Sequence, residues 1–339
     1  MGESNGTTHP TIRVGLIGLG SMGRHHARVI RETEGMDLVA VADPGGDKFG
    51  VAQALPVLPD VHALIDQGLD AAMVAVPTIY HEDVALALAA AGVHTMVEKP
   101  IAHTAEAGRR VADAFDKAEL VGAVGYVERC NPALLEMRRR IADGELGEVY
   151  QIATSRQGPF PGRISDVGVV KDLATHDVDL TAWLAQSPYE TVSAQVTHRS
   201  GREHEDMVVA VGRLANGVIV NHLVNWLSPR KERQTIVTGE RGALVADTAS
   251  ADLTFYANGT LATTWDAVAA FRGVSEGDAI RYAINKREPL RVEQENFRDT
   301  IHGTNTPATT AVSMAEGVHT LTVVEAILKA ASEASAVRV

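Results

Sequence analysis

The chain has 339 residues, which suits two domains better than one. Hydrophobic residues make up 45% of it and charged residues 22%, an ordinary composition for a globular protein with apolar cores. Its 31 basic and 43 acidic residues give a formal net charge of −12, which argues against a nucleic-acid or membrane-surface partner, because both need a basic face.

Cys130 is the only cysteine, so the chain can form no intrachain disulfide and no thiolate metal cluster. We expect it to be a small buried residue in a reducing compartment. The N-terminus has neither the cationic start nor the apolar run of a signal peptide, and no apolar stretch reaches the ~20 residues that span a bilayer. These features predict a cytoplasmic protein.

The first third of the chain alternates short apolar strands with helical patterns. Strands are predicted over residues 11–20, 38–44, 70–77, 93–100 and 120–127, and helices over 21–33, 81–92 and 104–118. Strand and helix alternating at this spacing indicate βαβ units and a parallel sheet. We therefore expect a doubly wound Rossmann domain over residues 1–128.

The pattern changes near Asn131, which with the following proline is typical of a helix start over residues 131–144. Strands with alternating polarity then follow over residues 148–156, 191–199, 206–214, 217–227, 233–240 and 252–257. Helices are predicted over 171–185 and 313–334. The turn pair Asn216-Gly217 favours antiparallel pairing. We expect an α+β domain over 129–339 with a large, mostly antiparallel, open sheet.

The turn after the first strand carries a dinucleotide-binding pattern. Gly18, Gly20 and Gly23 fit G-x-G-x-x-G between a strand and a helix, and Asp43 ends the next strand. In this pattern the glycines allow a tight turn and a close backbone approach to a pyrophosphate at the helix N-terminus. The carboxylate of Asp43 suits ribose hydroxyls and repels a 2′-phosphate, so the predicted cofactor is NAD.

Hydride transfer from a carbinol also needs a base for the hydroxyl proton and a donor that orients the oxygen. Lys99 lies at the carboxyl end of a predicted parallel strand, where ligands bind in open α/β sheets. Asp172 and His176 are four residues apart, on one face of a predicted helix. By spacing alone, Lys99 also fits a solvated lysine and the pair a surface ion pair.

Other polar residues leave two interpretations open. Adjacent helical side chains point in different directions, so His25 and His26 do not fit a metal site, and none is predicted. Arg156 and Arg163 flank the loop QGPFPG and fit either a diphosphate site or an exposed loop. Tyr126 follows the last Rossmann strand, where its hydroxyl fits either substrate contact or core packing.

The motifs G-L-G-S-M-G, A-V-P-T-I-Y-H, E-K-P and K-D-L-A-T-H-D-V-D, in this order, resemble those of the Gfo/Idh/MocA oxidoreductase family. The resemblance covers essentially the whole chain. It implies that Lys99 contacts nicotinamide and substrate, that His176 is the acid/base, and that Asp172 positions His176 or binds a sugar hydroxyl. It also implies an open sheet serving as a dimer or tetramer interface, and a last helix that returns to the first domain. The cofactor-binding residues predicted from these motifs are Gly18, Gly20, Ser21, Met22, Gly23, Asp43, Pro77, His81, Glu98 and Lys99.

The segments G-Y-V-E-R-C-N-P-A, N-W-L-S-P-R-K-E-R and T-G-E-R-G resemble the branch that contains UDP-N-acetylglucosamine 3-dehydrogenases, although Cys130 and Tyr126 depart from its usual Phe and His. The leading hypothesis is oxidation of a secondary ring hydroxyl of a sugar or sugar nucleotide, or the reverse reaction. Tyr126, Arg156, Arg163 and Asp172 are then the candidate substrate-binding residues. The alternatives are a cyclitol dehydrogenase, which does not need the two arginines, and a non-catalytic NAD-binding regulatory protein.

Overall fold

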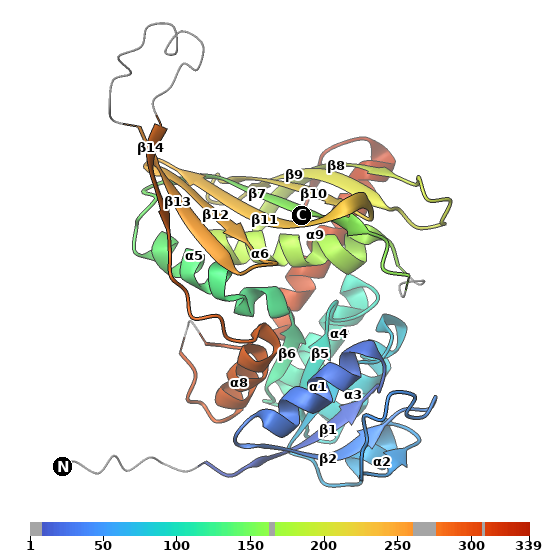
Figure 1. Cartoon of the computed structure of the whole chain (residues 1–339). Coiled ribbons are helices and arrows are strands. Elements are labelled where there is room, and N and C mark those ends of the chain that lie inside the picture. The colour runs from blue at the N-terminus through green and yellow to red at the C-terminus, as the bar shows by residue number, and fades with distance from the viewer. Residues whose placement is uncertain (1–8, 163–166, 260–275, 307–308) are drawn as a thin grey trace, which may run out of the picture. The chain divides into compact units, whose positions relative to one another are not determined.

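A computed structural model describes residues 9–162, 167–259, 276–306 and 309–339 (Figure 1). The chain divides into two compact units, each made of two stretches of sequence. The first unit comprises Met1–Val127 and Glu288–Leu321, and the second comprises Glu128–Arg287 and Thr322–Val339.

The first unit contains a six-stranded sheet in the order β3-β2-β1-β4-β5-β6, in which every pair of neighbours is parallel. Its strands are β1 (Ile12–Ile17), β2 (Met36–Ala42), β3 (Val57–Leu58), β4 (Ala71–Val74), β5 (His94–Glu98) and β6 (Gly122–Gly125). The strand order reverses between β1 and β4, the position where doubly wound sheets bind dinucleotides. The apolar runs of these strands are buried because helices connect successive strands.

The helices of this unit start and stop at residues that the local sequence specifies. They are α1 (Ser21–Glu32), α2 (Val61–Ile65), the 3₁₀ turn η1 (Thr78–Tyr80), α3 (His81–Ala90), α4 (Ala105–Lys117) and α8 (Pro289–Ile301). Asp60 and Thr104 cap α2 and α4 by accepting from Ala63 N and Ala107 N. Gly92 follows α3 with φ of 77°, a conformation that favours glycine.

The second unit contains a nine-stranded sheet in the order β14-β13-β12-β11-β7-β10-β9-β8-β15. Its strands are β7 (Val149–Pro159), β8 (Tyr189–Thr197), β9 (Met207–Leu214), β10 (Ile219–Asn225), β11 (Leu227–Gly239), β12 (Gly242–Asp247), β13 (Asp252–Asn258), β14 (Glu276–Arg281) and β15 (Val337–Arg338). All neighbours are antiparallel except β10 and β7, which are parallel. The predicted fold class, a Rossmann sheet followed by a mostly antiparallel sheet, is confirmed.

Helices cover one face of this second sheet (Figure 1). They include α5 (Pro132–Ala142) and α6 (Thr175–Ala185), with the short turn η2 (Val127–Cys130) ahead of α5. Asn131 caps α5 through Ala133 N, as its position before a proline predicts. Cys130 is buried, as expected. On the opposite face, Val209 and Val211 of β9 are 44% and 49% exposed.

The predicted helix over residues 171–185 differs in its first turn. Residues Val170–Ala174 form a π-helical turn, η3, and α6 begins only at Thr175. Asp172 therefore lies in the π turn and His176 in the α-helix, rather than both on one uniform helix face. Short π segments of this kind occur frequently at functional sites.

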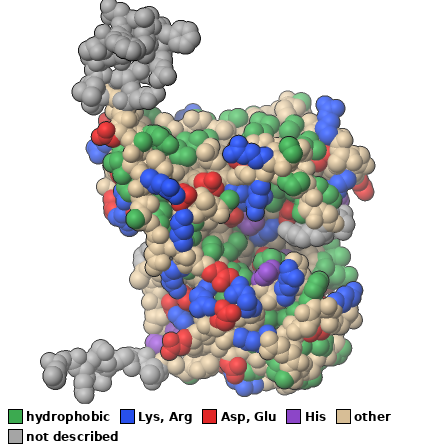
Figure 2. Space-filling model, in the orientation of Figure 1, with side chains coloured by type: hydrophobic (Ala, Val, Ile, Leu, Met, Phe, Trp, Pro, Cys, Tyr) green, Lys and Arg blue, Asp and Glu red, His purple; other side chains and the backbone are tan. Residues whose placement is uncertain are grey.

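The C-terminal third contains elements that periodicity did not reveal, namely β14, α8 and β15. The final helix α9 (Met314–Glu333) crosses the division between the two units at Leu321. None of the described helices has the length and apolarity needed to cross a membrane. Figure 2 shows basic and acidic side chains intermingled over the visible face of the molecule.

Candidate functional site

The glycine-rich turn between β1 and α1 has the geometry of an anion site. A Cβ on Gly23 would lie 1.9 Å from Gly18 O, and a Cβ on Gly18, whose φ is 94°, would lie 2.5 Å from Ala75 O. Glycine is therefore required at these two positions, because any side chain would clash with the backbone of the protein itself. A Cβ on Gly20 would meet no protein atom within 4 Å. The missing side chain of Gly20 thus leaves open space at the helix N-terminus.

Helix α1 begins at Ser21 with Gly20 as its N-cap and has no side-chain cap and no acidic residue in its first turn. The cap residue therefore has no side chain that could accept hydrogen bonds from the first backbone N–H groups of the helix. A helix N-terminus in this state attracts anions through these donors and through its dipole. This geometry suits the pyrophosphate of a dinucleotide, with Met22 in the same turn.

Asp43, at the carboxyl end of β2, is bonded to the turn that it faces. Its Oδ2 accepts from Leu19 N at 2.8 Å and its Oδ1 accepts from Gly45 N at 2.7 Å. Each carboxylate oxygen can accept a further hydrogen bond. Asp43 therefore fixes the shape of the glycine-rich turn and keeps acceptor capacity for ribose hydroxyls.

The E-K-P segment continues β5 at the same edge of the sheet, because the strands are parallel and their carboxyl ends align. Glu98 Oε2 accepts from Lys99 N at 3.2 Å. Burial by itself raises the pKa of Glu98, but the hydrogen bond and charge of His26, with Lys99, outweigh it and hold the pKa below its usual range. An ionised carboxylate thus lies next to Lys99 in the chain.

His81 is buried at the start of α3, after the 3₁₀ turn that Pro77 caps. Its Nδ1 lies 2.8 Å from Pro100 O and its Nε2 lies 2.9 Å from Val76 O. Both ring nitrogens therefore contact backbone oxygens that flank the predicted cofactor edge. His81 connects the segment after β4 to the E-K-P segment, and its predicted direct contact with the cofactor stays a prediction.

In the second unit, Asp172 and His176 lie on either side of the junction between η3 and α6, and both are buried. The start of the π turn is held by Glu205, whose Oε1 accepts from Val170 N at 3.0 Å. The junction therefore has a fixed place on the second unit. Lys99 belongs to the first unit, so the structure describes the two groups of predicted catalytic residues separately.

Arg156 occupies a buried position on β7 and is 4% exposed, not an exposed loop position. Its Nε donates to Asp177 Oδ2 at 3.0 Å and its Nη1 donates to Glu128 Oε1 at 3.0 Å. Burial opposes the charge of Arg156, but the two carboxylates outweigh burial and raise its pKa. Arg156 lowers the pKa of Glu128 despite burial, whereas burial outweighs Arg156 and raises the pKa of Asp177. The guanidinium is thus held by internal carboxylates, an arrangement that does not favour its predicted role as a diphosphate ligand.

Two further polar contacts anchor α6. Arg129 donates to both carboxylate oxygens of Asp179, at 2.8 and 2.6 Å. Tyr189 OH lies 2.6 Å from Thr181 Oγ1 and 2.8 Å from His222 Nε2. Burial lowers the pKa of His222 to about 4, so its ring is neutral near pH 7. These contacts, with that of Asp177, fix the helix that carries His176.

The structure places the remaining predicted substrate-binding residues in different environments. Tyr126 is fully buried, which favours the core-packing interpretation of this residue. Arg163 lies outside the described residues. Arg233, the first residue of the strand predicted over 233–240, lies on β11 opposite Arg156 and is half-buried. Thr235 and Val237, two and four residues further along the strand, lie on the same face as Arg233 and are apolar or small, so the alternation of the strand predicts that Arg233 faces inward.

Arg233 is a further candidate for the site, and none of the sequence motifs includes it as a site residue. Its pKa is lowered by burial and by the neighbouring Arg156, and it interacts electrostatically with Asp177, Glu128 and Asp172. Its Nη1 donates to Gln157 O at 2.6 Å. A half-buried cation beside Asp172 is a better candidate for a substrate contact than Arg156.

Comparison with known proteins identifies both halves of the chain. The family model for the oxidoreductase family with the NAD-binding Rossmann fold, GFO_IDH_MocA, matches residues 12–126. The model for the GFO/IDH/MocA C-terminal domain matches residues 134–245. Together they cover most of the chain, in the order that the sequence motifs predict.

Relatives of known name have moderate identity. An inositol 2-dehydrogenase from Saccharopolyspora erythraea is 33% identical over 62% of this chain, which spans 66% of that enzyme's length. A UDP-N-acetylglucosamine 3-dehydrogenase from Acidithiobacillus ferrooxidans is 28% identical over 86% of this chain and 88% of its own.

Solved structures have the same fold. A structure of UDP-N-acetylglucosamine 3-dehydrogenase from Acidithiobacillus ferrooxidans has a TM-score of 0.82 at 24% identity, covering 95% of this chain and 98% of that one. An oxidoreductase from Agrobacterium radiobacter, in complex with NAD+, L-tartaric acid and magnesium, has a TM-score of 0.82 at 16% identity, covering 97% and 98%.

The two family models confirm the family resemblance, the oxidoreductase class and the NAD cofactor that the sequence predicts. The glycine-rich turn, with Gly20 facing open space at the start of α1, is the part of the structure that suits this cofactor. The chain belongs to the Gfo/Idh/MocA family and is an NAD-binding oxidoreductase.

Proposed function

We propose that the protein is a dehydrogenase that oxidises a secondary ring hydroxyl of a sugar or sugar nucleotide to a ketone, with NAD as hydride acceptor. The observation that carries the proposal is the buried pair Asp172 and His176 at the π-to-α junction, in a family chain that also has the E-K-P lysine. A non-catalytic NAD-binding protein has no chemical reason to keep these three residues together.

Each residue has a distinct part in the proposed reaction. NAD, when bound, accepts the hydride that leaves the carbinol carbon. His176 accepts the proton of the hydroxyl as the C–O bond becomes a carbonyl. Lys99 orients the oxygen by donating to it, and Asp172 orients His176 or a substrate hydroxyl. In the reverse direction His176 returns the proton to the carbonyl oxygen.

A cyclitol dehydrogenase is the second candidate, and the internal bonding of Arg156 favours it. A nucleotide sugar presents a diphosphate that needs guanidinium or ammonium partners. Arg156 is bound to Asp177 and Glu128, so it meets that need less well than an exposed arginine. An inositol 2-dehydrogenase is also among the relatives with at least 30% identity. Of the described arginines, Arg233 is our candidate for the cation that a nucleotide sugar would need.

The two candidates differ in an assay of the purified protein with NAD and a panel of UDP-sugars, free sugars and inositols, followed through reduced nicotinamide. We expect turnover on a cyclic polyol or sugar with a secondary ring hydroxyl. Turnover on a UDP-N-acetyl sugar identifies the nucleotide-sugar branch, and turnover on inositols alone selects the cyclitol candidate. Failure with every polyol, and with the matching ketones plus NADH, contradicts the proposal.

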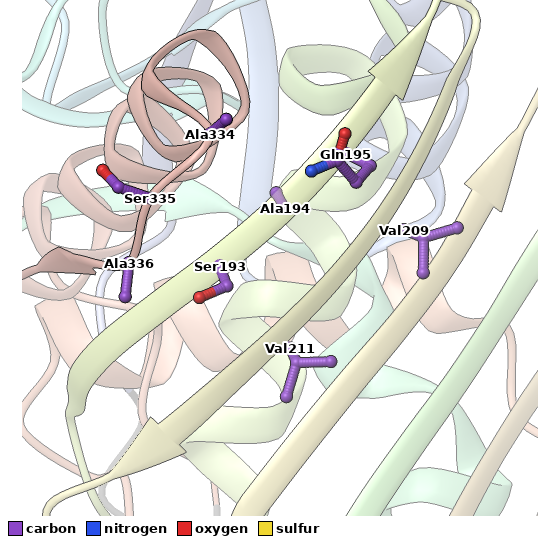
Figure 3. Close-up of a pocket in the computed structure, with 8 residues that line it drawn as sticks. All are labelled: Ser193, Ala194, Gln195, Val209, Val211, Ala334, Ser335 and Ala336. Atoms are coloured by element: carbon purple, nitrogen blue, oxygen red, sulfur yellow. The ribbon is translucent and has the colours of Figure 1, made fainter.

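We also propose that the protein forms a homodimer or homotetramer through the open face of the nine-stranded sheet. Apolar side chains project from this face, among them Val209, Val211, Ile219 and Tyr256. An open pocket on the same face is lined by Ser193, Ala194, Gln195, Val209, Val211, Ala334, Ser335 and Ala336 (Figure 3). Exposed apolar surface of this kind is typical of protein interfaces.

Replacing Val211 by Lys should therefore shift the protein towards the monomer, because a charge is costly to bury in an apolar contact. The measurement is the native mass by light scattering over a range of protein concentrations. Phe49→Lys is a matched control, since Phe49 is 55% exposed on the first unit. A wild-type protein that is monomeric at every concentration contradicts this interface.

A further inference from the structure

His26, one of the two adjacent histidines of α1, is buried beneath the E-K-P segment. It is 2% exposed, and its Nε2 lies 2.7 Å from Glu98 Oε1. Gln294 of α8 contacts the other side of the same ring, with Nε2 3.0 Å from His26 Nδ1. Three side chains from α8, α1 and β5 therefore form a line of hydrogen bonds that ends at the residue before Lys99.

The contacts determine where the ring proton of His26 lies. Gln294 Nε2 also lies 3.4 Å from the backbone oxygen of His26, which can only accept, so the nitrogen of the carboxamide faces the histidine. This nitrogen donates to His26 Nδ1. The proton of a neutral ring is then on Nε2, and Nε2–H donates to Glu98. Gln294 thus selects the tautomer in which His26 is a donor to the carboxylate.

We propose that His26 and Gln294 are positioning residues for the E-K-P segment. Gln294 orients the ring of His26, and His26 holds the Glu98 carboxylate ionised and in one place beside Lys99. This inference deepens the proposed function, because it rests on the predicted contact of Glu98 and Lys99 with the cofactor. No family motif assigned a role to either positioning residue.

The charges around Glu98 support this arrangement. Among the described residues, the titratable groups that act on it are His26 from α1, Lys99, which follows it directly after β5, and His81 from α3. Burial opposes ionisation of Glu98, and these three groups together reverse that effect, so its pKa is lowered. An ionised carboxylate accepts hydrogen bonds on both oxygens, whereas the protonated form must itself find an acceptor for its proton. The ionised form is therefore the better partner for cofactor hydroxyls.

The test compares His26→Leu, which removes the donor, with His26→Gln, whose carboxamide nitrogen can still donate to Glu98. The matched control is His25→Leu, since His25 is the neighbouring residue on α1 and its charged neighbours are Arg24, Arg28 and Glu288 rather than Glu98. The affinity for NAD is measured by titration calorimetry on the intact protein, from about pH 5 to pH 8, where a displaced carboxyl pKa would appear.

The sign of the effect follows from the folded-state pKa of Glu98. In the wild type this pKa is lowered, so the ionised form persists as the pH falls. Without the donor, burial is opposed by Lys99 and His81 but no longer by His26, so the pKa of Glu98 should rise. We then expect the acid limb of the pH profile, where NAD binding is lost, to lie roughly one to two pH units higher in His26→Leu than in the wild type. His26→Gln should return the limb towards the wild-type position, and His25→Leu should leave it unchanged.

Two results overturn the inference. One is a His26→Leu profile parallel to that of the wild type, whatever its height, because a purely structural role weakens binding equally at every pH. The other is a shift in His26→Gln as large as that in His26→Leu. If His26→Leu does not fold, Glu98→Gln replaces it, and it should remove the acid limb altogether. Binding of NAD needs no substrate, so these outcomes are independent of whether the polyol assay succeeds.

Discussion

His176→Ala should lower kcat by about 10²- to 10⁴-fold, the usual contribution of a positioned general base. His176 is the proposed acceptor of the hydroxyl proton, and it lies on α6, which is held through Asp177, Asp179 and Thr181 by Arg156, Arg129 and Tyr189. Removing the ring should therefore leave the helix in place. We expect the affinity for NAD to stay within about twofold of the wild type, because the glycine-rich turn belongs to the other unit.

The measurement pairs steady-state turnover on the substrate found in the polyol panel with calorimetric titration of NAD. His198→Ala is a suitable control, since His198 is exposed on the same unit. Unchanged turnover in His176→Ala would assign the base to another residue. Loss of NAD affinity together with turnover would instead indicate that the substitution disturbs the fold.

Arg156→Leu is expected to cost about 3–5 kcal/mol of unfolding free energy, the usual effect of removing one partner from a buried ion pair. The substitution leaves Asp177 and Glu128 without the guanidinium that both contact. Loss of this cation drives the desolvated carboxylates towards protonation or exposure, and either change weakens the attachment of α6 to β7. Urea denaturation followed by circular dichroism measures the difference.

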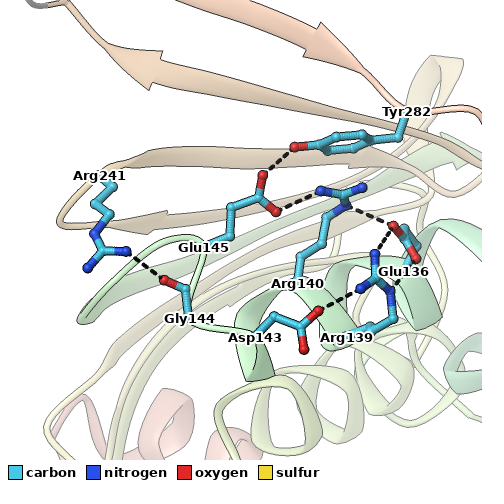
Figure 4. A network of polar contacts seen from close by, with 8 residues as sticks. All are labelled: Glu136, Arg139, Arg140, Asp143, Gly144, Glu145, Arg241 and Tyr282. Carbon is cyan, nitrogen blue, oxygen red and sulfur yellow. Dashed lines mark hydrogen bonds and ion pairs between the residues drawn. The ribbon is translucent and has the colours of Figure 1, made fainter.

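The surface of α5 offers a matched control for this experiment. Arg139 also bonds to two carboxylates, with Nη2 2.7 Å from Glu136 Oε1 and Nη1 2.6 Å from Asp143 Oδ2 (Figure 4). Its side chain is 56% exposed, so water replaces the lost contacts in Arg139→Leu and little stability is lost.

The same pair of variants distinguishes a structural role of Arg156 from a substrate-binding one. If the role of Arg156 is structural, Arg156→Leu should lose much stability and Arg139→Leu should lose little. If Arg156→Leu keeps the wild-type stability and raises KM for a nucleotide sugar, Arg156 is a diphosphate ligand after all. That result would also favour the nucleotide-sugar branch over the cyclitol candidate.

The network around Arg139 shows what sequence spacing can and cannot reveal. The pairs of Glu136 with Arg139 and Arg140 are three and four residues apart, a spacing that predicts contact on a helix. Arg140 also stacks on the ring of Tyr282, and its Cζ lies 3.1 Å from the ring centroid, although the two residues are far apart in sequence. Contacts of the first kind follow from the helix alone, and those of the second require the completed fold.

Similar reasoning applies to the candidate site. The turn glycines and Asp43 can be identified from sequence because local geometry requires these residue types. Gly18 has a positive φ, Gly23 lies too close to the backbone for a side chain, and Asp43 places a carboxylate at the end of a strand. The strand alternation that buries Arg156 and half-buries Arg233 is also present in the sequence. The alternation does not by itself predict a buried arginine, because a charged side chain next to a loop is usually exposed. An inward-facing arginine is stable only when a buried carboxylate pairs with it.

The sequence by itself determined the parallel and antiparallel halves, the family, the cofactor and the candidate residues Lys99, Asp172 and His176. These depend on hydrophobic periodicity, backbone conformation and motif spacing, which are properties of short segments. Only the tertiary structure decided that Asp177 and Glu128 share Arg156, and that Gln294 orients His26 towards Glu98. His26 and Gln294 are 268 positions apart, and such a contact depends on how whole elements pack, which no local pattern records.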